Sequence, residues 1–308
     1  MLKSLSVIPR YSLWRIAMSD SESILFVKFL SVNDFTASTT KALGHDFQKW
    51  VGWFEKINEE RYESSRVTIR DVTDFRKHLR EERGQAVATV NRCLVTLRRY
   101  FQFLVEREVI EANPAKGVKE LRRTPAAPQA IERSAIRRLL REASVRDDHR
   151  ASAILGIFVF CGLRISEVAA LQIGDVDLTE RRGSLTVRHG KQLKERSLPV
   201  PIQARRMLMD YLGSRPPADT DRIFIGRGLK PLGIDGVRYT VEKYGIAIGL
   251  DIHPHALRHT FATQYLEANN NDLVGLAQIL GHENIQTTSR YTQRGESQLS
   301  AASEMICY

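Results

Sequence analysis

The sequence predicts a mostly helical protein built from two domains. The first is an all-α four-helix domain, and the second is an α+β domain, mostly helical with a small antiparallel sheet. Three observations predict this division. Apolar residues recur at spacings of three and four through residues 21–108, prolines and cations interrupt that pattern over residues 113–130, and short strand-like runs alternate with helical segments from residue 131 onward.

Four amphipathic segments account for the first domain, which we place at residues 19–112. The residues before it, 1–18, form an N-terminal extension without a clear role. Ser38-Thr39-Thr40 offer hydroxyl oxygens that can cap the second segment, and Gly84 is the kind of residue that commonly follows the end of a helix. The four helices are expected at about 24–30, 38–54, 69–84 and 86–104.

A basic, extended linker is predicted at residues 113–130. Asn113-Pro114 and the two prolines of Thr124-Pro125-Ala126-Ala127-Pro128 disfavour a helix there. Such a segment suits a hinge that lets two domains close as a C-shaped clamp around DNA, and it equally suits an ordinary soluble interdomain linker. Its cations are Lys116, Lys119, Arg122 and Arg123.

The second domain is placed at residues 131–308. Helical patterns and strand-like runs alternate at its start, and helices return toward its end. Helices are expected at about 134–143 and 149–161 and from Ile165; strands are expected at 184–188 and 196–200, with 222–225 as a candidate third strand.

The charge favours an acidic polymer as partner. Forty-six Lys and Arg against 36 Asp and Glu give a net charge of +10. The cations interleave with apolar residues rather than forming a tail, as at Arg92, Arg98 and Arg99 in the fourth helical segment. Because many soluble proteins are mildly basic, the charge alone decides little.

The three cysteines are far apart and form no CxxC pair, which favours a reducing cytoplasm and gives no sign of a structural zinc. The longest apolar run, residues 153–163, is too short to span a bilayer and reads as a buried helix. We therefore expect a cytoplasmic protein that does not enter a membrane.

A tyrosine near the C-terminus is the candidate nucleophile. Tyr291 follows His282 by nine positions. A phenol has a pKa near ~10, so it needs cationic help to attack a phosphate. Arg164 follows the end of the buried helix, and His255 and Arg258 share one face at the start of a helix that Pro254 would begin. An arginine suits a phosphate because its planar fork pairs with two oxygens.

Two other interpretations compete with this one. Arg164 could instead pair with Glu167, three residues on, and Arg258 with any nearby carboxylate. His255 and His259 stand four apart on one helical face, as zinc ligands do. However, no glutamate stands between them as a metalloprotease helix requires, and Arg258 would repel a dication, so we expect no metal.

Several motifs together resemble the tyrosine recombinase, or phage integrase, family, with spacing similar to its Xer-type and simple site-specific branch. The catalytic-domain resemblance covers about residues 131–295, and the helical domain before it resembles the family's core-binding domain more weakly. The motifs are Cys161–Glu167, Gly190–Arg196, Pro254–Thr263 and Leu280–His282 leading to Tyr291.

The resemblance implies DNA strand exchange without metal, ATP or other cofactor. Tyr291 would form a 3′-phosphotyrosyl bond, Arg164 and Arg258 would stabilise the transition state, and Lys191 would protonate the leaving oxygen. His255 would assist proton removal and His282 would hydrogen-bond the phosphate. The family's turn usually reads Gly-Lys-Gly-x-Lys, and Gln192-Leu193 here keeps Lys194 open as an alternative acid.

The implied partners are double-stranded recombination sites and other copies of the chain, four protomers acting through a Holliday junction, with residues 295–305 as a docking tail. A type IB topoisomerase, or a non-catalytic DNA-binding relative, is the alternative. The residues expected to contact DNA are Arg92, Arg98, Arg99, Lys116, Lys119, Arg122, Arg123 and Lys194.

Overall fold

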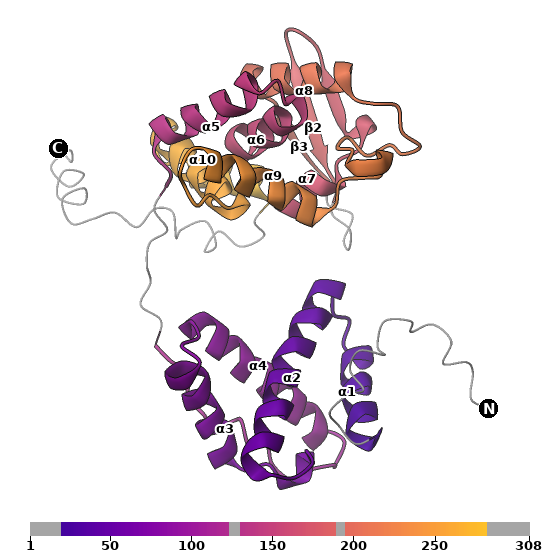
Figure 1. Ribbon diagram of the computed structural model, residues 1–308, viewed down its shortest axis with the longest axis vertical. Helices are drawn as coiled ribbons and strands as arrows, with labels where there is room; N and C mark the ends of the chain where they lie inside the picture. Colours follow the sequence, from indigo (N-terminus) through magenta and orange to yellow (C-terminus); the bar gives the residue numbers. More distant parts are fainter. Residues whose placement is uncertain (1–19, 123–129, 189–194, 282–308) are drawn as a thin grey trace, which may run out of the picture. The chain divides into compact units, whose positions relative to one another are not determined.

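A computed structural model describes residues 20–122, 130–188 and 195–281. The chain divides after Ala126 into two compact units, here called the N-terminal unit and the C-terminal unit (Figure 1). Each unit has a hydrophobic core of its own. The predicted combination of an all-α unit with a mostly helical α+β unit is confirmed.

Over residues 20–122, the N-terminal unit has four main helices around an aromatic core. Phe47, Trp50 and Tyr100 are completely buried there, and Trp53 is 8% exposed. Trp50 packs edge-on against Phe75, with ring centroids 5.2 Å apart. The helices are α1 (Asp20–Val32), α2 (Ala37–Asn58), α3 (Ile69–Lys77) and α4 (Val87–Val105). A short 3-10 helix lies at Ser64–Arg66, and a π-helical segment, His78–Glu82, continues α3.

The predicted cap of α2 is wrong by a few residues. The helix begins at Ala37, and the side chain of Thr36 accepts a hydrogen bond from the N–H of Thr39 at 3.2 Å. Ser38-Thr39-Thr40 therefore lie inside the first turn. A run of hydroxyl residues offers several possible caps, and the periodicity alone does not choose among them.

The first half of the segment predicted to be an extended linker packs against the N-terminal unit. Ala115 is fully buried and Val118 is 4% exposed. The Arg98 guanidinium donates hydrogen bonds to the carbonyl oxygens of both residues, at 3.3 and 2.6 Å. Two small apolar side chains three residues apart give little signal among the surrounding cations, so composition alone suggests a solvated linker.

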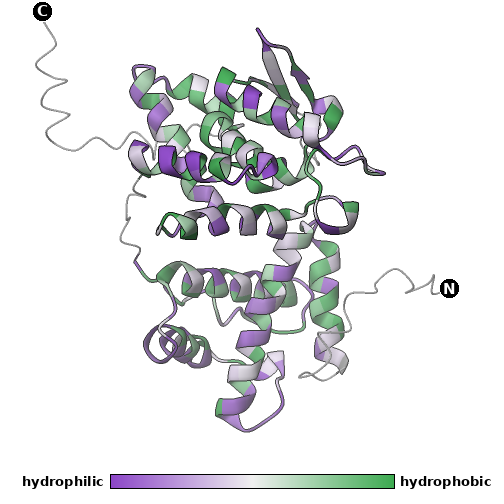
Figure 2. Ribbon diagram, turned by 45° about the horizontal axis from the view of Figure 1, so that its top comes forward, coloured by the Kyte–Doolittle hydropathy of each residue, from purple (hydrophilic) through white to green (hydrophobic). Residues whose placement is uncertain are grey.

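The C-terminal unit packs its helices around α6, whose residues are almost all buried. The predicted buried helix is confirmed, and Figure 2 shows hydrophobic and hydrophilic residues interspersed along the helices of this unit. None of the helices in the described ranges is both long and apolar enough to cross a bilayer. The helices are α5 (Arg133–Val145), α6 (His149–Cys161), α7 (Ile165–Ala170), α8 (Ile202–Ser214), α9 (Ile234–Ala247), α10 (Pro254–Ala268) and α11 (Leu273–Leu280).

A three-stranded antiparallel sheet completes this unit, in the order β1 (Val176–Leu178), β2 (Gly183–Val187) and β3 (Arg196–Pro199). The two predicted strands are confirmed as β2 and β3. β1 was not predicted, because three residues carry no measurable alternation. The candidate strand 222–225 is wrong: its residues form only isolated bridges, Gln172 to Arg222 and Ile225 to Pro231.

Candidate active site

Two glycine turns end the helices that border the candidate site. Gly162 follows α6 and Gly281 follows α11, both with φ of 62°. A Cβ on Gly162 would collide with the ring of Phe261, and one on Gly281 would lie 2.8 Å from Arg196 Nη1. Both positions therefore favour glycine for its left-handed backbone and for close contact. The carbonyl oxygens of these turns become acceptors for arginine side chains.

Arg164 lies at the start of α7, immediately beyond the Gly162 turn. Its Nη1 donates to Glu167 Oε1 at 2.9 Å, and its backbone N–H donates to Glu167 Oε2 at 2.7 Å. Its Nη2 also donates to the Gly281 carbonyl oxygen at 3.2 Å. The pairing with Glu167 considered from the sequence is therefore real, and it holds Arg164 beside the end of α11.

Arg258 reaches the same place from α10, which begins at Pro254 as predicted. The side chain is only 4% exposed. Its Nη1 donates to the Gly162 carbonyl oxygen at 2.7 Å, and its Nη2 donates to that of Leu280 at 2.9 Å. Arg258 thus joins the ends of α6 and α11.

Sequence reasoning missed a third arginine, Arg196, at the start of β3. Its Nη1 and Nη2 donate to the two carboxylate oxygens of Glu167 at 3.0 and 2.9 Å. Its Nε donates to the Ile279 carbonyl oxygen at 2.8 Å. Arg196 belongs to the motif Gly190–Arg196, in which the sequence predicts a role only for the lysines. We call Arg164, Arg196, Arg258 and Glu167 the arginine cluster.

The end of α11 is the common acceptor of the cluster. The three successive carbonyls of Ile279, Leu280 and Gly281 each accept a bond from a different arginine. The last carbonyls of a helix have no partner within it and carry the negative end of the helix dipole, so they favour cations. Among the described residues, three guanidiniums therefore surround one carboxylate and leave the cluster cationic, as a phosphate-binding site requires.

Glu167 holds the cluster together in its ionised form. Burial raises the pKa of its carboxyl, but hydrogen bonds from Arg196 and the Arg164 N–H and the nearby positive charges outweigh burial, so the pKa lies below its usual value of 4.5. Because its side chain is only 6% exposed, water screens these interactions weakly.

Glu167→Gln is expected to lower the free energy of unfolding by about 3–5 kcal/mol at neutral pH, because it removes the charge that three arginines share. A lowered folded pKa contributes stability that is complete above the unfolded value and is lost as pH falls through the folded value. The difference between wild type and Glu167→Gln in urea unfolding should therefore shrink below pH 4.5. A difference that grows in acid would contradict this assignment.

The histidines in and before α10 differ in exposure: His253 and His255 are exposed, and His259 is buried. His255 is exposed in the first turn of α10, on the same face as Arg258, whereas His259 is 6% exposed. His253, before the helix, lies 3.3 Å from Asp251 and 3.6 Å from Glu242. Over residues 20–122, 130–188 and 195–281, no cluster of three or more His, Cys, Asp or Glu residues could hold a metal ion.

Four candidate catalytic residues lie outside the described residues: Lys191, Lys194, His282 and Tyr291. Their neighbours in the chain are described. Gly281 directly precedes His282, and its carbonyl is bound by Arg164. Arg188 and Glu195 flank the segment that contains both lysines.

The expected DNA contacts of the N-terminal unit fall into two classes. Arg92 forms two hydrogen bonds with buried Asp46, at 2.9 and 2.7 Å, and Arg98 binds Glu120 at 2.7 Å besides its two backbone acceptors. These two arginines have structural partners inside the protein. Arg92 is nonetheless half exposed, the other exposed cations are Arg99, Lys116, Lys119 and Arg122, and Arg123 lies outside the described residues.

Comparison with known proteins accounts for both units. The model of the phage integrase family matches residues 129–298, and that of the phage integrase N-terminal SAM-like domain matches residues 24–108. Tyrosine recombinase XerC of Pseudomonas fluorescens strain Pf-5 is 31% identical over 273 residues, covering 85% of this chain and 88% of the relative. XerC of Escherichia coli O157:H7 is 35% identical over 216 residues, covering 68% and 71%.

Solved structures show the same fold. XerH recombinase bound to its difH substrate before cleavage aligns with a TM-score of 0.72 at 19% identity, covering 93% of this chain and 85% of that one. A λ integrase dimer bound to a core site aligns with a TM-score of 0.70 at 15% identity, covering 90% and 96%. The matched length and the identity to XerC relatives mean that this chain belongs to the phage integrase family of tyrosine recombinases.

Proposed function

We propose that this protein is a site-specific DNA recombinase that breaks and rejoins strands through a 3′-phosphotyrosyl intermediate and a Holliday junction. The observation that carries the proposal is the arginine cluster at the end of α11. It gathers three guanidiniums from α7, β3 and α10 immediately before His282, and the candidate nucleophile Tyr291 follows nine positions later in the sequence.

The cluster would bind the scissile phosphate and stabilise the negative charge that develops on it during the reaction. The Tyr291 oxygen attacks phosphorus and its proton passes to His255, while the bond to the 5′ oxygen breaks. Arg164 and Arg258 would hold the non-bridging oxygens, since preorganised donors stabilise developing charge better than water does. The energy of the broken bond is kept in the phosphotyrosine, so rejoining needs no high-energy cofactor.

Proton delivery to the leaving 5′ oxygen is assigned to Lys191, with Lys194 as the alternative, and His282 would hydrogen-bond the phosphate. The exposed cations Arg99, Lys116, Lys119 and Arg122 would neutralise backbone phosphates, and Arg123 and Lys194 would add to them. Arg92, though paired with Asp46, keeps half of its side chain exposed for the same use. Arg98 would act mainly by holding residues 115–118 in place.

The proposed partners are two double-stranded recombination sites and three further copies of the chain, with residues 295–305 docking on a neighbouring copy. We place this reaction in the cytoplasm, at the nucleoid. The proposed domain limits are 1–18, 19–112, 113–130 and 131–308, and the start of the linker packs on the N-terminal unit.

A two-site plasmid tests the proposal against the topoisomerase alternative. DNA flanking the gene is cloned as two copies in one supercoiled plasmid, and a second plasmid carries no copy. We expect recombinant circles from the first plasmid alone. Relaxation of both plasmids without recombinants would instead favour a type IB topoisomerase, and binding without any covalent adduct would favour a non-catalytic relative.

Metal independence is a second expected result. The cluster supplies guanidiniums and one carboxylate already bound by them, and this donor set does not suit Mg²⁺, which prefers free carboxylate oxygens and water. A nicked suicide substrate should therefore give the covalent protein–DNA adduct at an unchanged rate in excess EDTA. A rate that falls in EDTA and returns on adding Mg²⁺ or Zn²⁺ would contradict this mechanism.

A further inference from the structure

The end of β2 and the start of β3, which border the segment that connects these two strands, each carry an arginine bound to a buried carboxylate. Val187 of β2 pairs in register with Arg196 of β3, and the chain between them contains Lys191 and Lys194. At the β3 end, Arg196 binds Glu167 and the carbonyl of Ile279. A general acid must come within hydrogen-bonding distance of the leaving oxygen, so what holds the ends of this hairpin affects catalysis.

Arg188 holds the β2 end. It directly follows the last residue of β2, and its Nε lies 2.6 Å from Asp175 Oδ1. Its Nη1 donates to Gln172 Oε1 at 3.2 Å. The side chain of Asp175 is 4% exposed and that of Arg188 is 53% exposed. The arginine thus spans from the protein surface to a buried anion.

Asp175 is itself fixed. Its Oδ2 accepts the backbone N–H of Gln172 at 2.8 Å and closes the short helix Ile173–Asp175. Within the described residues, its buried Oδ1 makes no hydrogen bond of standard geometry, so the charge of Arg188 is what faces this oxygen. Loss of Arg188 would leave a buried carboxylate oxygen without its ion pair, and the end of β2 would lose its attachment.

The Arg188–Asp175 and Arg196–Glu167 attachments lie close together in the C-terminal unit. A cavity of about 200 Å³ is lined by Arg188 and Asp175 and also by Glu167, the carboxylate of the arginine cluster. The hairpin is therefore bound at both ends beside the residues proposed to hold the phosphate.

We propose that Arg188 and Asp175 are positioning residues that hold the general-acid lysine in place for strand cleavage. Arg188 would act through the strand that leads to Lys191 and would not touch the DNA at the reacting atoms. This inference rests on the proposed function, specifically on a lysine of this hairpin as proton donor.

The test compares cleavage of ordinary DNA with cleavage of a suicide substrate that carries sulfur at the bridging 5′ position. A thiolate leaves without a proton, so defects in proton delivery vanish on this substrate. Arg188→Ala should cleave ordinary DNA about 10- to 100-fold more slowly than wild type, because a displaced catalytic group loses about that much. On the sulfur substrate its rate should lie within about threefold of wild type, since no proton is needed. Asp175→Asn should show the same pattern.

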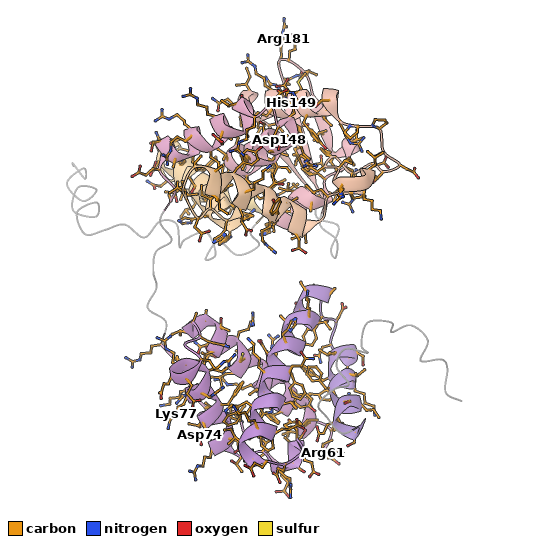
Figure 3. All side chains as sticks on the ribbon, in the orientation of Figure 1. Arg61, Asp74, Lys77, Asp148, His149 and Arg181 are labelled. Carbon is orange, nitrogen blue, oxygen red and sulfur yellow. The ribbon has the colours of Figure 1, made fainter. Side chains whose placement is uncertain are left out.

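Arg181→Ala is the matched control. Arg181 lies in the turn between β1 and β2, at the opposite end of β2, and Figure 3 shows its side chain extending away from the body of the unit. This variant should cleave both substrates as wild type does. Arg188→Lys keeps a cation facing Asp175, so it should fold even if Arg188→Ala does not, with a smaller defect confined to ordinary DNA.

Lys191→Ala and Lys194→Ala distinguish failure of the proposed proton donor from failure of the positioning role of Arg188. If sulfur rescues neither lysine variant, the proposed proton donor is wrong and this inference falls with it. If sulfur rescues a lysine variant but Arg188→Ala and Arg188→Lys are equally slow on both substrates, the positioning role alone is overturned. Wild-type rates for both Arg188 variants on ordinary DNA would overturn it as well.

Discussion

Tyr291→Phe is expected to bind its DNA site with unchanged affinity and to form no covalent adduct. The change removes only the phenol oxygen, which is the atom proposed to attack the phosphate, and leaves the arginine cluster intact. Binding is measured by gel shift, and the adduct is measured as protein–DNA complexes that survive SDS on a nicked suicide substrate.

Tyr244→Phe and Tyr265→Phe provide the controls within the described residues. The hydroxyl of Tyr244 donates to Asp148 at 2.9 Å, and burial and this bond raise its pKa to about 12. Burial and a bond to Asp272 likewise raise the pKa of Tyr265. A raised pKa makes a phenol harder to deprotonate, so both variants should keep the adduct. An adduct that persists in Tyr291→Phe and disappears in one of the controls would show that the tyrosine changed in that control is the nucleophile.

Arg258→Ala is expected to slow cleavage by at least ~10²–10³-fold on ordinary DNA, the loss typical of removing one donor to a developing oxyanion. Sulfur at the 5′ position should not rescue it, because charge stabilisation is needed whatever the leaving group. Arg164→Ala should behave in the same way. Single-turnover cleavage of both substrates measures the effect.

Stability must be separated from catalysis in this experiment. Arg258 donates to the carbonyls of Gly162 and Leu280, and each buried acceptor left unsatisfied costs about 1–3 kcal/mol. Arg205 is a matched control in the same unit: it is 7% exposed and donates to the Glu180 carbonyl at 2.7 Å, away from the cluster. Arg205→Ala should lose stability and keep cleavage. Equal losses of cleavage in Arg205→Ala and Arg258→Ala would reduce Arg258 to a structural residue.

The long helices could be predicted because each carries its own signal. α4 and α6 repeat apolar residues over several turns, and Pro254 marks the first turn of α10. The pairing of Arg164 with Glu167 could also be foreseen, since the residue before a helix lies next to the side chain three positions on. Local spacing was sufficient for these features.

The convergence of the cluster could not be predicted in the same way. Arg196 lies 29 residues beyond Glu167 in the chain, and its third partner is a backbone carbonyl of α11, which no sequence pattern marks. The partners of Arg92 and Arg98 could not be predicted either: their spacing among apolar residues predicts a DNA-binding face, and the structure adds acceptors within the protein that bind both side chains. Tertiary packing brings a cation and its acceptor together, so the composition of the sequence does not predict which acceptor a cation binds.

The aromatic core of the N-terminal unit also determines what spectroscopy can report. The protein has three tryptophans, and Trp14, Trp50 and Trp53 all precede Ala127, where the C-terminal unit begins. Trp50 and Trp53 are buried, so their emission should shift when that core opens to water. Fluorescence then follows the N-terminal unit alone, whereas circular dichroism follows the helices of both. Unfolding curves from the two methods will coincide only if the halves of the molecule melt as one cooperative body.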